Sequence, residues 1–137
     1  MSDANNLTKL IELAISKEFP DVRLWRVNTG VWAPWELVRQ ALALLTARKY
    51  DSAASILKRC RPIRSGINGQ ADLTGLASVA IAGRRVGIRL EIEVKTGNDK
   101  LGEDQIRFRN VVQSLGVIYI EARSVEQCVR ELRERLC

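Results

Sequence analysis

Hydrophobic and charged residues alternate along residues 87–97, and this alternation predicts a β-strand with two chemically different faces. The apolar positions are Ile88, Leu90, Ile92 and Val94, and the charged positions between them are Arg89, Glu91, Glu93 and Lys95. Successive side chains of a strand point to opposite faces of the sheet, so each set is expected to share one face. The same pattern also fits a half-exposed strand whose charged face is solvated.

The residues before this stretch predict a second strand that folds back on it. Residues 69–81 have the character of a strand, and residues 82–87 have the glycine and polar content of a connecting turn. Antiparallel pairing would bring Asp72 close to Glu93 and Lys95. Two converging carboxylates suit a divalent cation such as Mg²⁺, and a lysine beside them can hold a metal-bound water. Such a set suits cleavage of a phosphodiester.

A wider set of residues resembles a known family. Asp72, then Glu93-Val94-Lys95, then Gln105 are similar to the D…ExK…Q signature of the PD-(D/E)XK nuclease superfamily, and specifically of its VRR-NUC branch. The resemblance extends to Glu12 and to residues 26–30, 69–73 and 116–120. It implies a restriction-endonuclease-like core, in which a mixed central sheet is flanked by helices, with residues 1–137 forming a single nuclease domain.

The resemblance also implies a role for each residue of the motif. Asp72 and Glu93 would hold one Mg²⁺ or Mn²⁺ with help from the carbonyl of Val94. Lys95 would position the attacking water, and Gln105 would fix the lysine. The activity implied is metal-assisted hydrolysis of DNA.

Two further glutamates, Glu91 and Glu12, are also candidates for this metal site. Alternation puts Glu91 and Glu93 on the same face, so the pattern alone leaves open which of them binds metal, and the resemblance selects Glu93. Glu12 lies at the edge of an apolar stripe, where a solvated glutamate is the ordinary interpretation. The resemblance implies instead that Glu12 reaches the metal site and ligates a second ion.

The rest of the chain alternates between helical and strand patterns. Residues 7–19, 102–115 and 124–136 have apolar residues at helical spacing, whereas residues 22–31 and 117–122 are typical of strands. The expected inner positions are Leu7, Leu10, Ile11 and Ala14 in the first helix and Phe108, Val111, Val112 and Leu115 in the second. This order predicts an α/β fold with a mixed sheet.

Residues 32–61 depart from the family pattern and predict a helical insert after the first strand. Residues 35–47 and 51–58 are expected to form two amphipathic helices. Plain packing or a dimer contact is favoured over a DNA-facing arm, because the insert is rich in apolar residues and its basic residues are spread out. Trp25, Trp32 and Trp35 could stack on unpaired bases, although core packing is the commoner role at such positions.

The charge balance favours a polyanionic partner. The formal net charge is +6 and the isoelectric point is about 9.7. Residues 59–66 form a basic loop before Asp72 that either tracks phosphates or is simply solvated. The candidate DNA-binding residues, the first two of them by resemblance, are Arg26, Asn28, Arg61, Arg64, Lys100, Arg107 and Arg109.

Several classes of protein and site are disfavoured by the sequence. Three cysteines without CxxC spacing, together with no histidine, make a zinc site an unfavourable interpretation. The longest apolar run is too short to cross a bilayer, and the chain does not open with the pattern of a signal peptide. We therefore expect a cytoplasmic protein of a bacterial or phage-infected cell, without a membrane partner.

The resemblance points to branched DNA as the substrate. Stand-alone VRR-NUC proteins of phages and bacteria resemble Holliday-junction resolvases that act as homodimers in DNA repair and recombination. Symmetric cutting of a four-way junction needs two active sites related by a two-fold axis, so a homodimer is expected. The alternatives are a flap or general structure-dependent endonuclease and, from another class, a non-catalytic DNA-binding subunit with the nuclease fold.

Overall fold

The chain divides into two compact units. The computed structural model describes residues 3–28, 30–61 and 63–136, and for residues 30–32 and 63–64 it describes the backbone alone. The larger unit joins residues 1–28 to residues 67–137, and the smaller unit spans residues 29–66. The two units are described separately below.

A four-stranded mixed sheet forms the centre of the larger unit. Its strands are β1 (Val22–Arg26), β4 (Leu73–Ile81), β5 (Arg84–Val94) and β6 (Ile118–Ala122), arranged in the order β1-β4-β5-β6. β1 pairs antiparallel with β4 and β4 with β5, whereas β5 and β6 run parallel. The predicted α/β class with a mixed sheet is therefore confirmed.

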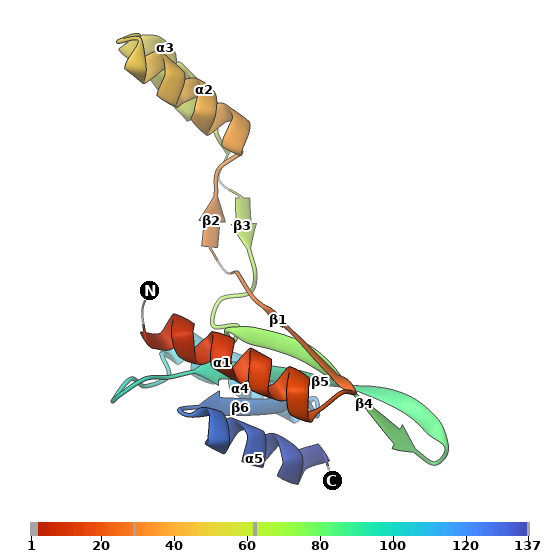
Figure 1. Ribbon diagram of the computed structural model, residues 1–137. Coiled ribbons are helices and arrows are strands. Elements are labelled where there is room, and N and C mark those ends of the chain that lie inside the picture. Colours follow the sequence, from red (N-terminus) through yellow and green to blue (C-terminus); the bar gives the residue numbers. More distant parts are fainter. Residues whose placement is uncertain (1–2, 29, 62, 137) are drawn as a thin grey trace. The chain divides into compact units, whose positions relative to one another are not determined.

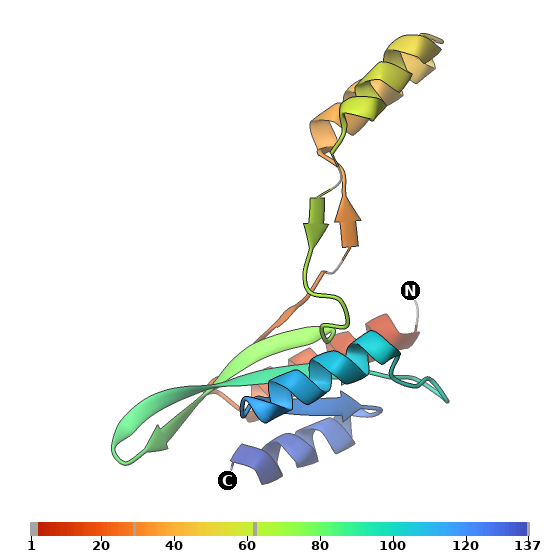
Figure 2. The same cartoon turned by 180° about the vertical axis from the view of Figure 1, so that it is seen from behind.

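Helices cover the two faces of this sheet unequally. α1 (Asp3–Glu18) and α5 (Val125–Leu136) lie on one face, as Figure 1 shows. α4 (Glu103–Ser114) crosses the opposite face (Figure 2). The main core lies between the sheet and the helix pair α1/α5, and its most buried members include Ile11, Ile15, Leu73, Leu90, Ile92, Ile120, Cys128 and Leu132. Beneath α4 lies a smaller cluster of Ala71, Phe108, Val112 and Tyr119.

The β4–β5 hairpin turns more tightly than the sequence indicates. β5 begins at Arg84, so the connecting turn contains only Ala82 and Gly83 rather than residues 82–87. Both turn residues have a positive φ, 49° for Ala82 and 76° for Gly83, as a two-residue hairpin turn between twisted strands requires. Arg84 and Arg85, which lie within the predicted turn of residues 82–87, therefore belong to β5.

The predicted first strand is wrong in its extent. The pattern over residues 22–31 predicts one strand, but β1 ends at Arg26 and β2 (Gly30–Trp32) pairs with β3 (Ile63–Ser65) in a separate sheet. Alternation alone carries no information on which partner a strand segment takes, so one pattern covers segments of two units.

Three expected core residues are exposed instead. Leu10 is 54% exposed, Val111 is 59% exposed and Leu115 is 76% exposed. Leu10 and Val111 lie beside the buried stripes of their helices, and a helix that packs against one layer buries only the side chains that face it. Leu115 lies just after the end of α4 as its C-cap. Ile11 and Ile15 of α1, and Phe108 and Val112 of α4, occupy the buried stripes.

The smaller unit contains the predicted helical insert. α2 (Trp35–Thr46) and α3 (Tyr50–Arg59) pack on each other with Ala41 and Ala53 buried, which confirms two helices close to their predicted bounds. Trp35 is 69% exposed, so it does not take the expected core role, and the side chain of Trp32 lies outside the described residues. Within the described part of the chain, none of the helices has the length and apolar character to span a membrane.

Candidate active site

The open end of the β4–β5 hairpin brings the predicted acidic residues together. Leu73 pairs with Ile92, so Asp72 lies opposite Glu93 one position further along the antiparallel register. The Asp72 carboxylate accepts a hydrogen bond of 2.8 Å from the backbone N–H of Val94. The predicted convergence of Asp72 and Glu93 is confirmed, whereas their roles stay a prediction.

Lys95 and Gln105 complete a hydrogen-bonded group around Glu93. The Lys95 ammonium lies 3.1 Å from Oε1 of Glu93 and donates to Oε1 of Gln105 over 3.0 Å. The amide nitrogen of Gln105 donates a short hydrogen bond to Oε1 of Glu93. Gln105 therefore contacts both charged partners, and each of its polar ends faces a group of the complementary kind.

The Glu93 carboxylate is poorly compensated. Glu93 is 3% exposed, and Oε2 is buried without a hydrogen-bond partner in the described structure. The pKa of Glu93 rises from an ordinary 4.5 to about 6, first because burial disfavours the carboxylate and second because Asp72 carries the same charge. The contacts with Lys95 and Gln105 favour the carboxylate but do not cancel these effects.

The Lys95 side chain stays charged despite its burial. Burial disfavours the ammonium form, but the hydrogen bond and charge of Glu93 and the charge of Asp99 outweigh it, so the pKa of Lys95 is raised. Asp99 lies 3.4 Å from the ammonium. At neutral pH Lys95 is therefore a hydrogen-bond donor and does not accept a proton.

The first turn of α4 holds Gln105 in place. Gln105 stands at the third position of the helix and its Oε1 also accepts a hydrogen bond of 3.0 Å from the N–H of Gly102. The loop before Asp72 packs closely on this turn, because a Cβ at Gly69 would lie 2.2 Å from the carbonyl oxygen of Asp104. Gly69 also has a φ of 78°, which favours glycine. The glycine thus allows α4 to approach the strand that carries Asp72.

A second polar group lies on the same sheet face, one step further along the strands. Glu91 is fully buried, and its Oε1 accepts hydrogen bonds from Thr74 at 2.9 Å and from the guanidinium of Arg89 at 2.8 Å. Thr74 lies opposite Glu91 in the register. Glu91 therefore accepts hydrogen bonds from Thr74 and Arg89, whereas Glu93 is contacted by Lys95 and Gln105 of the candidate site.

Tyr119 is a buried polar residue of the site that the sequence pattern does not single out. β6 places Tyr119 beside Glu91 in the parallel register, and its hydroxyl is buried without a hydrogen-bond partner in the described structure. Burial raises the pKa of Tyr119, and the charge of Glu93 raises it further. The sequence pattern could not predict that Tyr119 lies beside Glu91, because this depends on β6 pairing with β5.

The two carboxylates fit a divalent cation. Glu93 offers a buried oxygen without a partner, and Asp72 adds a second negative charge beside it. Across residues 3–28, 30–61 and 63–136, no three acidic or cysteine side chains converge as metal ligands. Mg²⁺ commonly binds through one or two carboxylates and keeps several waters, so two carboxylates are sufficient for such a site.

Glu12, the expected ligand of a second ion, lies on α1. It lines a pocket of about 370 Å³ between α1 and β1, together with Lys9 and Arg23. Among the described residues, Glu12 makes no hydrogen bond or ion pair with Asp72 or Glu93. Its part in metal binding stays a prediction.

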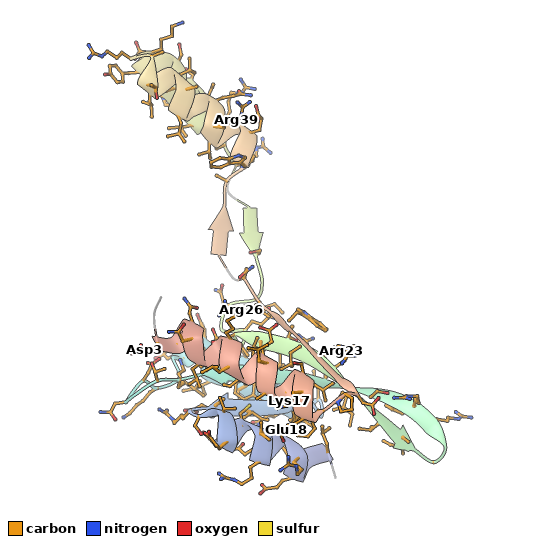
Figure 3. The ribbon with its side chains drawn as sticks, viewed as in Figure 1. Asp3, Lys17, Glu18, Arg23, Arg26 and Arg39 are labelled. Atoms are coloured by element: carbon orange, nitrogen blue, oxygen red, sulfur yellow. The ribbon has the colours of Figure 1, made fainter. Side chains whose placement is uncertain are left out.

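Five of the candidate DNA-binding residues lie in the larger unit. Arg26 lies at the end of β1 (Figure 3). It donates to Asn5 of α1 over 3.3 Å, and Asn28 follows as an exposed residue. Lys100 is exposed in the loop after β5. Arg107 is exposed on α4 within 4 Å of Glu103 and Asp104. Arg109, also on α4, is partly buried.

The remaining two candidates belong to the smaller unit. Arg61 is exposed after α3, and Arg64 lies in β3 opposite Val31. The side chain of Arg64 lies outside the described residues. The predicted loop over residues 59–66 is therefore wrong in part, because β3 occupies Ile63–Ser65 and pairs with β2. Contact of this basic segment with DNA stays a prediction.

A loop beyond Lys95 adds residues that the sequence pattern also missed. The Arg123 guanidinium donates to the carbonyl oxygens of Gly97 at 3.0 Å and Asp99 at 2.7 Å, and pairs with Glu121 at 2.6 Å. These bonds hold the loop that presents Asp99 to Lys95. No signal in the chain links Arg123 to this loop, since the contact spans more than 20 residues.

Comparison of the chain with protein-family models, with curated proteins and with solved structures finds no match.

Proposed function

We propose that the protein is a metal-dependent, structure-specific DNA endonuclease with a restriction-endonuclease-like core of the PD-(D/E)XK type. The observation that carries this proposal is the convergence of Asp72, Glu93 and Lys95 at one end of the β4–β5 hairpin, with Gln105 hydrogen-bonded to the last two. Two carboxylates and a charged lysine match the needs of phosphodiester hydrolysis, in which negative charge on the phosphate must be neutralised.

Each residue of the group has a distinct part in this reaction. Asp72 and Glu93 would hold Mg²⁺ or Mn²⁺ with the carbonyl of Val94, and the bound ion supplies positive charge and favours hydroxide over water. Lys95 stays protonated, so its ammonium donates to the attacking water or to a phosphate oxygen and orients them. Gln105 positions Lys95 through its amide oxygen.

The state of Glu91 supports the choice of Glu93 as the ligand. Glu91 is already paired with Arg89 over 2.6 Å and bonded to Thr74. Moving it to a metal would leave the Arg89 charge without its partner, which has a free-energy cost. Glu93 has a raised pKa, so a cation would relieve a destabilised carboxylate.

Branched DNA is the substrate class that we propose, with a four-way junction first. The net charge of +6 favours DNA, and the exposed basic residues of the larger unit would track its phosphates. Resolution of a junction requires two copies of the site, so the proposal includes a homodimer. Exposed apolar residues in the smaller unit, Leu42, Leu45, Tyr50 and Leu57, offer surface for a second copy.

Cleavage of end-labelled DNA tests this proposal. A four-way junction, a 5′ flap, a single strand and a plain duplex are incubated with Mg²⁺, with Mn²⁺ or with chelator, and wild type is compared with Glu93→Gln. Glu103→Gln, an exposed substitution on α4, serves as the matched control. Paired symmetric nicks in the junction, lost with chelator and in Glu93→Gln alone, are the expected result.

Other outcomes separate the alternatives. Preference for the flap would replace the resolvase by a flap or general structure-dependent endonuclease. Binding of DNA without cleavage of any substrate would contradict the enzyme and favour a non-catalytic DNA-binding subunit. Light scattering of the same samples measures the oligomeric state, and a monomer at working concentration would contradict the homodimer.

A further inference from the structure

Large apolar side chains of the larger unit are exposed on the sheet face that carries the candidate site. α4 packs on β6, whereas β1 and the start of β4 leave large apolar side chains exposed on this face. Trp25 is 48% exposed and Leu76 is 49% exposed. Trp25 lies opposite Thr74 in the register, and Thr74 lies two positions after Asp72, so all three share one face.

A pocket occupies this uncovered area. It has a volume of about 390 Å³ and is lined by Trp25, Gln70, Thr74, Gly75, Leu76 and Arg89. This volume falls within the range of small-ligand pockets. Its walls combine an aromatic ring, an aliphatic side chain, an amide and a guanidinium, which is the chemistry that contacts the face and the edge of a heterocyclic base.

Arg89 and Thr74, two polar residues that line the pocket, are both hydrogen-bonded to the buried Glu91. Arg89 is 47% exposed in its side chain, and its guanidinium is anchored by two contacts with the fully buried Glu91, at 2.8 and 2.6 Å. Thr74 donates to the same carboxylate oxygen. An arginine fixed in this way presents a planar group at little further entropic cost, because its rotamer is already set.

We infer that this pocket binds an unpaired nucleobase of the DNA strand whose phosphate lies at Asp72 and Glu93. Trp25 stacks on the face of the base, and Arg89 and Gln70 contact its edge. The inference rests on the proposed function for the identity of the strand, and it adds a binding residue, Trp25, and a substrate feature, an unpaired base beside the cleaved bond.

The position of the pocket matches this occupant. Two residues along a strand span about 7 Å and neighbouring strands lie about 5 Å apart, so Trp25 stands within about 10 Å of the Asp72 backbone. A strand of DNA that passes the carboxylates therefore reaches the pocket with a nearby base. Stacking accepts any base, which agrees with a protein that selects structure and not sequence.

The pocket also explains how branched DNA would be preferred over plain duplex. A base enters it only after leaving its stack, and the energy required is smallest where a base is unpaired or poorly stacked. Branch points and single-strand overhangs provide such bases, whereas a continuous duplex does not. DNA with an unpaired base would therefore bind more tightly beside Asp72 and Glu93 than continuous duplex would.

Binding to matched overhangs tests the inference without cleavage. Fluorescence anisotropy is measured in chelator with a duplex that carries an oligothymidine overhang and with the same duplex whose overhang is entirely abasic. The phosphates are identical, so the ratio of the two dissociation constants reports contacts with bases alone. We expect wild type to prefer the thymidine overhang about 10-fold, as stacking of one base predicts.

Three variants assign this preference to the pocket. Trp25→Ala is expected to abolish it, and Trp25→Phe to retain most of it. Trp35→Ala, which removes a tryptophan that is 69% exposed in the smaller unit, is expected to leave it unchanged. Equal discrimination by wild type and Trp25→Ala, or no discrimination by wild type, would overturn the inference.

Failure of the inference and failure of the proposed function give different results. The binding experiment contains no divalent metal, so it does not depend on catalysis. Base discrimination that requires Trp25 in a protein that cuts no DNA would sustain the pocket and reject the nuclease. Cleavage with no dependence on Trp25 in either assay would sustain the nuclease and reject the pocket.

Discussion

The two faces of β5 bury different kinds of side chain, although they belong to the same strand. On the face covered by α1 and α5, Leu90 and Ile92 are almost completely buried in an aliphatic core. On the face shared with α4, Glu91 and Glu93 are buried to the same extent. Burial of an aliphatic side chain stabilises the fold, whereas burial of a charge has a cost unless its partners compensate it.

The difference indicates which face is organised for chemistry. The polar face leaves three buried oxygens without hydrogen-bond partners in the described structure, those of Glu91 Oε2, Glu93 Oε2 and Tyr119 OH. Aliphatic residues at these positions would satisfy the fold at lower cost. Retention of a destabilised carboxylate beside a lysine is typical of functional sites, where stability and activity make opposing demands.

The largest effect is expected on the apolar face. Ile92→Ala removes a fully buried side chain and should lower the free energy of unfolding by about 4 kcal/mol, through lost burial and the cavity that remains. Urea unfolding measures this loss. Ile81→Ala, at a position that is 55% exposed, should change stability by less than about 0.5 kcal/mol. Similar losses in the two variants would mean that this face is not the core.

On the polar face, Lys95→Ala should affect the reaction more than binding. We expect the cleavage rate to fall at least 100-fold, about 2.7 kcal/mol of barrier, because the ammonium acts on the reacting groups. DNA affinity should remain nearly intact. Single-turnover cleavage and anisotropy measure the two quantities, and Lys17→Ala on the exposed side of α1 is the control. A Lys95→Ala variant with wild-type activity would remove Lys95 from the mechanism.

Substitution of two glycines with nearly equal φ tests how the loop before Asp72 packs against the first turn of α4. Gly69 (φ 78°) packs against the backbone of Asp104, whereas a Cβ at Gly83 (φ 76°) would point into open space. Gly83→Ala should destabilise the protein by about 1 kcal/mol from backbone strain alone. Gly69→Ala should cost about 2 kcal/mol and slow cleavage, because it displaces the turn that carries Gln105. Equal effects of the two variants on stability and cleavage would contradict this account.

The smallest effect expected is a gain in stability, opposite in sign to the losses above. Glu93→Gln should stabilise the metal-free protein at neutral pH by about 1 kcal/mol, because the pKa of Glu93 is raised to about 6 and its charged form opposes folding. The folded state binds more protons between pH 4.5 and 6, so wild type loses stability as the pH rises through this window. The gain of the variant should therefore vanish as the pH falls from 6 to 4.5. Thermal unfolding at several pH values measures it, and a destabilised variant at pH 7 would contradict the assignment.

The sequence predicts those features of the site that depend on local pattern. Period-two alternation places Glu91, Glu93 and Lys95 on one face, and the hairpin places Asp72 opposite Glu93. Strand order is not encoded locally, so the neighbourhood of Tyr119 on β6 could not be predicted. The pattern also does not predict that Trp25 is exposed, because its exposure depends on how much of the sheet α4 covers.

Calorimetric titration with Mn²⁺ tests most directly whether Asp72 and Glu93 bind a cation. Wild type at pH 7.5 should give saturable heat that is lost in Glu93→Gln and in Asp72→Asn, and retained in Glu103→Gln, whose side chain is 91% exposed. The affinity of wild type should weaken as the pH falls below about 6, where protons compete for Glu93. The same heat in wild type and in Glu93→Gln would contradict the account.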